Sequence, residues 1–243
     1  MTPSSEYDNR DEYRRLIAQR MVSWRTEYRE TELFICADSK LERLALDAVM
    51  QLRIVLDGYI SNQPEFAKSL VPVEPLPDAP SVVADMCRAA YAANVGPMAA
   101  VAGAFSDYVG REILRHSKEV IVENGGDIFM KADTERTVAV YAGNSPLSLK
   151  LGILVEPGPV AICTSSGTVG PSLSFGRADA AVVVSRDACL ADACATRLGN
   201  EIKGADDIAR ALDVIAAIPG VIGAVAVLGD KCGAVGDIRL VTV

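Results

Sequence analysis

Histidine is almost absent from this sequence, since His116 is the only one among 243 residues. A histidine-rich metal site is therefore excluded, and any Ser-His-Asp or Cys-His catalytic site would have to use that single residue. His116 follows Glu112 at the end of a run with helical periodicity, where a cation suits the helix dipole. We interpret His116 as part of a helix C-terminus and not as a base.

The chain also has no CxxC pair, although it contains six cysteines, so the usual zinc and redox spacings are missing. We expect most of these cysteines to be reduced, buried thiols. Cys189 and Cys194 are five residues apart and would not share a helix face. A thiol function for either one is a third hypothesis, supported only by the nearby cations Arg186 and Arg197.

Convincing membrane spans and an excess of basic residues are missing as well. Uncharged residues 89–106 and 157–176 approach the length of roughly 18 residues that a membrane span needs, but alanine, glycine and proline dominate them. Residues 1–13 have no apolar core of the kind found in secretory signals. The net charge of −8 disfavours binding to nucleic acid. We expect a cytoplasmic protein without membrane or nucleic-acid partners.

The first half of the chain predicts a hairpin followed by helices. Residues 21–37 alternate in polarity and carry β-forming residues, which is typical of a hairpin. Ser39 is expected to cap a helix that runs to about Ile60, and Ser81 to cap another. Pro97 is well suited to begin a third helix, which would extend to about His116.

The second half predicts mainly strands. The expected strands are 119–122, 128–131, 137–141, 147–155, 160–164, 180–184, 221–228 and 238–243, and the expected helices are 190–202 and 206–218. Strands in runs and helices in pairs indicate an α+β fold with a largely antiparallel sheet and helices on one face. We expect a single domain over residues 1–243, with a mobile lead (1–17), a hairpin and helix (18–80) and a core with the ligand site (81–243).

The predicted helix at residues 97–116 has an unusually bare surface, which includes Gly103 and Gly110. A glycine inside a helix costs about 1 kcal/mol relative to alanine. We therefore expect close packing on a sheet, or close approach of a ligand, at these positions.

Two loops and one helix carry residues suited to binding. Glycines in Asn124, Gly125, Gly126 and Asp127 permit a positive φ and close approach of a ligand, although a plain hairpin turn remains an alternative. The second loop offers hydroxyls and backbone N–H groups for phosphate oxygens; an ordinary polar loop is its alternative reading. Its residues are Thr164, Ser165, Ser166 and Gly167.

Asp192 and Thr196 lie four residues apart and would share one face of a helix. A carboxylate and a hydroxyl in that arrangement suit a hard cation such as Mg²⁺. The alternative is an acidic residue that merely favours the dipole at the helix start.

In this order, the stretches resemble the ApbE family of flavin transferases. Residues 100–105 resemble its small-residue helix motif, 123–127 its Asn-x-Gly-Gly-Asp/Glu turn, and 164–167 its Thr-Ser-Gly loop. Residues 191–196 resemble its Ala-Asp-Ala-x-x-Thr helix. The whole chain is still more similar to a prokaryotic offshoot of that superfamily, through residues 64–70, 95–103, 122–128 and 172–179.

This resemblance implies a T-fold-like α+β core that binds FAD and Mg²⁺. It implies metal ligation by Asp192, Thr196 and the Ala102 carbonyl, and it places the ligand against the 124–127 and 164–167 loops. The implied functions are binding of a flavin or another phosphorylated ligand, FMN transfer to a Thr or Ser of a client protein, or cleavage of the FAD pyrophosphate.

Two departures from the family pattern keep another function open. Glu123 stands where the family has asparagine, and the segment 170–179 lacks the family's His-x-x-Asp-Pro sequence. The alternative is a non-enzymatic assembly or carrier protein in anaerobic sulfur or redox metabolism. Whether the chain is an enzyme is not decided by its sequence.

Overall fold

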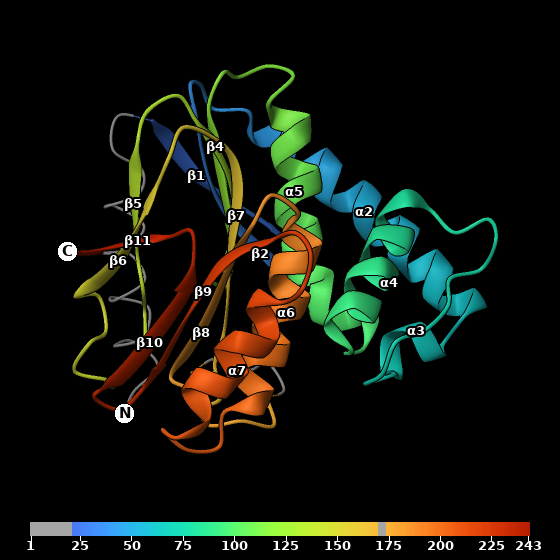
Figure 1. Ribbon diagram of the computed structural model, residues 1–243. Helices are drawn as coiled ribbons and strands as arrows, with labels where there is room; N and C mark the ends of the chain where they lie inside the picture. The colour runs from blue at the N-terminus through green and yellow to red at the C-terminus, as the bar shows by residue number, and fades with distance from the viewer. Residues whose placement is uncertain (1–20, 170–173) are drawn as a thin grey trace.

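The computed structural model describes residues 21–169 and 174–243, and the expected mobile lead at residues 1–17 lies outside them. An eight-stranded sheet forms the centre of the molecule (Figure 1). Helices cover one of its faces, and a three-stranded sheet packs against the other. Neighbouring strands in both sheets are antiparallel, so the predicted α+β fold is confirmed.

The large sheet has the strand order β1-β2-β3-β4-β7-β8-β9-β10, and the small sheet has the order β11-β6-β5. The strands are β1 (Val22–Tyr28), β2 (Thr31–Ala37), β3 (Val120–Asn124), β4 (Asp127–Ala132), β5 (Arg136–Ala139), β6 (Leu151–Val155), β7 (Gly158–Ser165), β8 (Ala180–Ser185), β9 (Val221–Leu228), β10 (Lys231–Gly236) and β11 (Arg239–Thr242). The helices are α2 (Glu42–Asn62), α3 (Glu65–Lys68), α4 (Ser81–Ala93), the 3₁₀ turn η1 (Pro97–Ala100), α5 (Val101–Ile113), α6 (Ala188–Glu201) and α7 (Asp207–Ala216).

Alternation along the central strands divides the buried side chains between two hydrophobic cores. Val122 and Val183 face the helical layer, whereas their neighbours Ile121 and Val182 face the small sheet. Successive side chains of a strand point to opposite faces, so a strand buried on both sides is apolar throughout. This explains the nearly continuous apolar sequences of β8 and β9.

The bare surface of α5 is used for close packing. A Cβ atom at Gly103 would lie 2.3 Å from the backbone oxygen of Ala188 on α6. A Cβ atom at Gly110 would lie 2.4 Å from the Phe129 ring on β4. The two glycines therefore let α5 approach both its neighbouring helix and the sheet, and this close packing compensates their low helix propensity.

Two predicted caps are wrong. α2 begins at Glu42 after Leu41, not after Ser39, and no side chain caps it. Ser81 is the first residue of α4, and its N-cap position is occupied by Pro80. Neither serine therefore provides the side-chain cap that its residue type predicts.

Other boundaries differ by a few residues. The helix that follows Pro97 opens as η1 and ends at Ile113, so His116 lies in the turn after α5. Within residues 21–169 and 174–243, no helix is both long enough and apolar enough to cross a bilayer. α2, with 21 residues, carries charged side chains along its exposed side.

Candidate functional site

Asp192 lies at the crossing of α5 and α6, four residues after the first residue of α6. The backbone N–H of Gly103 donates a hydrogen bond of 2.8 Å to its Oδ2 atom. Burial raises the pKa of Asp192 from 3.8 to about 7, and hydrogen bonds from the Gly103 and Ala102 backbone oppose that rise. The carboxyl is therefore buried where α5 and α6 meet, and it is not an exposed acid that merely favours the helix dipole.

The glycine turn between β3 and β4 is held against the start of α5. Gly125 and Gly126 have φ angles of 66° and 115°, as a two-residue hairpin loop requires. The Glu123 carboxylate accepts a hydrogen bond from the Gly126 N–H at 3.0 Å. The side-chain amide of Asn124 donates to the Ala102 carbonyl at 3.3 Å. The turn is thus a hairpin, and it also lies beside α5.

Asp127 connects this turn to the second loop. Its Oδ1 atom accepts a hydrogen bond of 3.2 Å from the backbone N–H of Thr164. Burial, together with the nearby charge of Asp192, raises the pKa of Asp127 well above 3.8. Two carboxyl groups, Asp127 and Asp192, therefore lie close together in a largely buried place, and the charge of Asp192 disfavours the ionisation of Asp127.

Ser106 is a component of the site that sequence reasoning did not identify. It is fully buried, and its hydroxyl lies 2.8 Å from the Asp127 carbonyl and 3.0 Å from the Ala102 carbonyl. The single hydroxyl hydrogen is donated to one of these oxygens at a time. Its spacing of four residues from Ala102 on α5 is the signal that could have identified it.

Several backbone donors in the second loop and just after it are used within the protein and are therefore not free for phosphate. The Gly167 N–H donates to the Ala178 carbonyl at 2.8 Å. Thr168 and Val169 donate their N–H groups to the Ser166 hydroxyl oxygen. Hydroxyls of small polar residues satisfy nearby backbone groups in this way in many turns. Thr164 and Ser165, at the end of β7, are half-buried, and so is Ser166.

The structure thus brings together most of the residues singled out in the sequence. Ala102 contacts Asn124, Asp192 contacts the next residue on α5, and Asp127 contacts Thr164. Ser166 and Gly167 instead bond to the segment around Ala178. Thr196 follows Asp192 by one helical turn and is half-buried. Residues 170–173 of the histidine-free segment lie outside the described residues.

The donor set has the chemistry of a hard-cation site. Asp192, Thr196 and Ala102 would supply only carboxylate, hydroxyl and carbonyl oxygens, which Mg²⁺ prefers. Among the residues that the structure describes, no group of three or more His, Cys, Asp and Glu side chains is arranged to hold a metal. A cation here would therefore depend on neutral oxygens as well as on the Asp192 carboxylate.

Comparison with known families gives a match along most of the chain. A family model described as "AbpE bacteria" matches residues 14–234. A "UPF0280 protein" of Methanocella arvoryzae is 43% identical over 213 residues, which cover 86% of each chain. A "UPF0280 protein" of Methanococcus aeolicus is 40% identical and covers 83% of this chain and 84% of its own.

The fold is similar to that of a solved flavin transferase. The structure titled "Flavin Transferase ApbE from Vibrio cholerae" superposes with a TM-score of 0.59. The match covers 89% of this chain and 96% of the other, at 15% sequence identity. At that identity the likeness establishes the shared fold.

Proposed function

This chain belongs to the ApbE-like family described as AbpE bacteria, and from that premise we propose that it binds a flavin nucleotide, or another phosphorylated ligand, together with Mg²⁺. The proposal includes two enzymatic forms, FMN transfer to a client protein and cleavage of the FAD pyrophosphate. It places the protein in the cytoplasm.

The observation that carries the proposal is the meeting of three distant stretches at the start of α5. The Gly103 N–H points at Asp192, and the neighbouring Ala102 carbonyl accepts the Asn124 amide. Thr164 joins the same group through Asp127. Buried polar groups gathered from separate elements, with shifted pKa values, are more frequent at binding sites than elsewhere.

The metal would be held by Asp192, Thr196 and the Ala102 carbonyl. When bound, Mg²⁺ neutralises the negative charge of phosphate oxygens and stabilises charge that develops on a leaving phosphate. The Ala102 carbonyl is already approached by the Asn124 amide. We expect a cation at that carbonyl to displace this long hydrogen bond and to leave the amide free to donate to the ligand.

The ligand would lie against Asn124–Asp127 and against the 164–167 loop. The donors that we assign to it are the Asn124 amide and the hydroxyls of Thr164 and Ser165, because the backbone donors of the second loop are used internally. Ser166 and Gly167 would then shape this loop and not bind the phosphate through their own N–H groups. None of these residues is basic, so a phosphate here would depend on the cation for charge.

The second candidate function is a non-enzymatic helper in redox or sulfur metabolism. It is favoured by one observation, the lack of histidine between residues 170 and 179, where the resemblance leads us to expect it. A helper of this kind would bind the ligand or a client protein without turnover.

Titration calorimetry with FAD, with and without Mg²⁺, tests the binding proposal. We expect tight binding that requires Mg²⁺ and that is lost in Asp192→Asn, because the amide keeps the shape of the carboxyl without its charge. Asp213→Asn is the matched control, since Asp213 is an exposed aspartate on α7. Unchanged binding in Asp192→Asn would refute the assignment of the metal to this residue.

Product analysis separates the two functions. Release of AMP from FAD, with or without transfer of FMN to a co-purifying protein, supports the enzymatic forms. Binding without release of AMP, together with a stable client in a pulldown, supports the helper. If FAD does not bind under either condition, the flavin proposal is wrong.

A further inference from the structure

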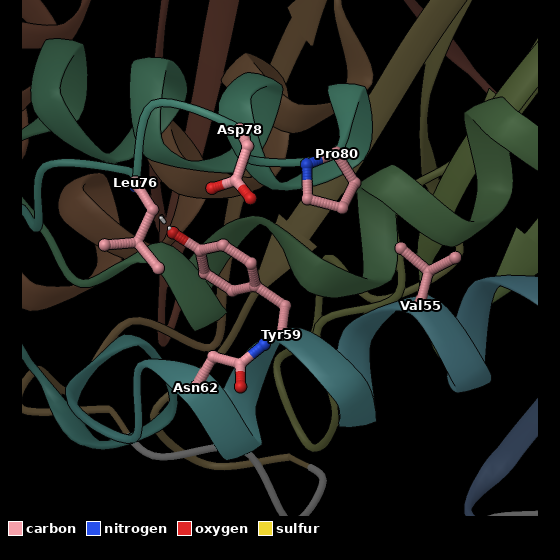
Figure 2. A pocket seen from close by; sticks show the side chains of 6 residues that line it. All are labelled: Val55, Tyr59, Asn62, Leu76, Asp78 and Pro80. Carbon is pink, nitrogen blue, oxygen red and sulfur yellow. Dashed lines mark hydrogen bonds between the residues drawn. The ribbon is translucent and has the colours of Figure 1, made fainter.

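A cleft of about 370 Å³ lies away from the candidate site, between α2 and the connector that leads to α4 (Figure 2). None of the residues assigned to the flavin proposal lines it. Its walls are formed by Val55, Tyr59, Asn62, Leu76, Asp78 and Pro80.

Hydrogen bonds join the two sides of the cleft, α2 and the connector. The Tyr59 hydroxyl accepts a hydrogen bond of 2.9 Å from the Leu76 N–H. The Gln63 amide donates to the Glu74 carbonyl at 3.0 Å. The Tyr59 ring also packs edge-on against Phe66, with 5.2 Å between ring centroids. A proline-rich connector fixed in this way is preorganised, so a ligand would bind with little ordering of the protein.

Asp78, which is exposed, gives the cleft a negative charge that none of the described residues pairs with. Its carboxylate points into the cleft above the Tyr59 ring (Figure 2). No basic residue is among those that line the cleft. Among residues 21–169 and 174–243, no hydrogen bond or ion pair to the Asp78 side chain is formed. A cation that entered the cleft would meet this carboxylate and could pair with it.

Two walls of the cleft carry partly exposed apolar side chains. Val55 and Leu76, on opposite walls of the cleft, are 36% and 37% exposed. Ile54, the residue before Val55 on α2, is 65% exposed. A free amine would leave these groups in water, whereas a peptide with apolar residues beside a basic one would cover them.

We propose that this cleft is a docking site for a partner protein and that it receives a lysine or arginine side chain flanked by apolar residues. The basic group would pair with Asp78, and the apolar neighbours would lie on Val55 and Leu76. This surface is independent of the flavin proposal, since the two share no residue.

Amide NMR shifts of the full-length protein, titrated with the peptide acetyl-Leu-Arg-Leu-amide, test the proposal. We expect saturable shifts at Asn62, Leu76 and Asp78, with a dissociation constant on the order of 1 mM for so small a contact. The same peptide with citrulline in place of arginine keeps the shape but not the charge. We expect it to bind at least about fivefold more weakly, because it cannot form the ion pair.

Asp78→Asn should reduce binding of the arginine peptide to the level of the citrulline peptide. Asp230→Asn, at an exposed aspartate of the β9–β10 turn, should leave it unchanged.

Equal binding of both peptides, or no saturable shift at millimolar concentration, would overturn the proposal. Equal binding of cadaverine, which has no apolar flanks, would point to a free amine instead of a protein. Concentration-dependent shifts of the same amides without peptide would assign the cleft to a second copy of this chain.

Discussion

The Gly103 N–H donates a 2.8 Å hydrogen bond to the Asp192 carboxylate at a point where α5 and α6 almost touch. The missing side chain of Gly103 makes this bond possible, because a Cβ atom would lie 2.3 Å from the Ala188 carbonyl oxygen and 2.9 Å from the Asp192 Cβ. The same glycine thus sets the helix spacing and the position of the carboxylate.

Gly103→Ala should therefore destabilise the protein and weaken Mg²⁺-dependent ligand binding. The new methyl group meets backbone of α6, which cannot move aside as a flexible side chain would. We expect a loss of about 3 kcal/mol in the free energy of unfolding, similar to severe overpacking in a core. Urea unfolding measures the loss. Gly58→Ala on α2 is the control, since nothing lies within 4 Å of its Cβ position. It should stabilise the helix by up to about 1 kcal/mol.

The buried Asp192 carboxyl makes stability depend on pH in a defined direction. In the folded protein burial raises the pKa of Asp192 to about 7, whereas the unfolded chain keeps a value near 3.8. Between these two pH values the unfolded state loses a proton that the folded state retains. Without bound metal, the contribution of Asp192 to stability should therefore fall as pH rises through this window and become constant above about pH 7.

Asp192→Asn removes this contribution and keeps an oxygen that can accept the Gly103 hydrogen bond. The stability of the variant relative to the parent protein should increase between pH 4 and pH 7, by on the order of a few kcal/mol. Urea unfolding at several pH values in the presence of a chelator measures this difference. Parallel profiles for the two proteins would contradict the shifted pKa.

The six cysteines should differ sharply in their reactivity toward thiol reagents. Burial raises the pKa of Cys36 and Cys194 to about 12 and that of Cys87 to about 11. It also raises the pKa values of Cys163 and Cys189 well above 9.0. Only Cys232 is exposed. A thiol reagent at pH 8 should therefore modify one thiol of the native protein quickly and the other five only on unfolding.

Cys232→Ser should abolish the fast reaction. Fast labelling of Cys189 or Cys194 in that variant would revive the hypothesis of a functional thiol on α6. Retention of ligand binding after modification of Cys232 is also expected, because this residue lies on β10, outside the candidate site.

The elements that could be predicted from sequence are those with strong local patterns. The alternation in residues 21–37 predicts the β1–β2 hairpin, and the glycine pair at Gly125–Gly126 predicts the turn of the β3–β4 hairpin. The separate packing of β5, β6 and β11 as a small sheet was not predicted. It depends on which apolar faces meet across the molecule, and a strand pattern alone does not contain that information.

The candidate site shows the same division. The side chains of Asn124, Asp127 and Asp192 were identified by residue type and spacing, which are local features. The partners of the loop's backbone N–H groups could not be predicted from local features. The Ala178 carbonyl that accepts from the Gly167 N–H is eleven residues away, across the 170–173 segment. Ser106 could not be assigned to the site for a similar reason, since its hydrogen-bond partner on β4 is 21 residues away in the sequence.

Ser106 gives the last prediction, because its hydroxyl joins α5 to the carbonyl of Asp127. Ser106→Ala removes the donor and leaves a buried carbonyl without its side-chain partner. We expect a loss of about 1–3 kcal/mol in the free energy of unfolding. We also expect weaker Mg²⁺-dependent binding of FAD, because the glycine turn loses a contact that positions it against α5. Urea unfolding and calorimetry measure the two effects.

Ser61→Ala is the matched control for Ser106→Ala. The Ser61 hydroxyl also bonds to the carbonyl four residues earlier on its helix, at 2.8 Å, but it is exposed to water on α2. Water can replace the lost donor there, so the change in stability should stay within about 0.5 kcal/mol. If both variants lose the same small amount and both bind FAD like the parent protein, Ser106 does not position the turn. A loss confined to Ser106→Ala would instead show that the carbonyl of Asp127 needs this buried donor.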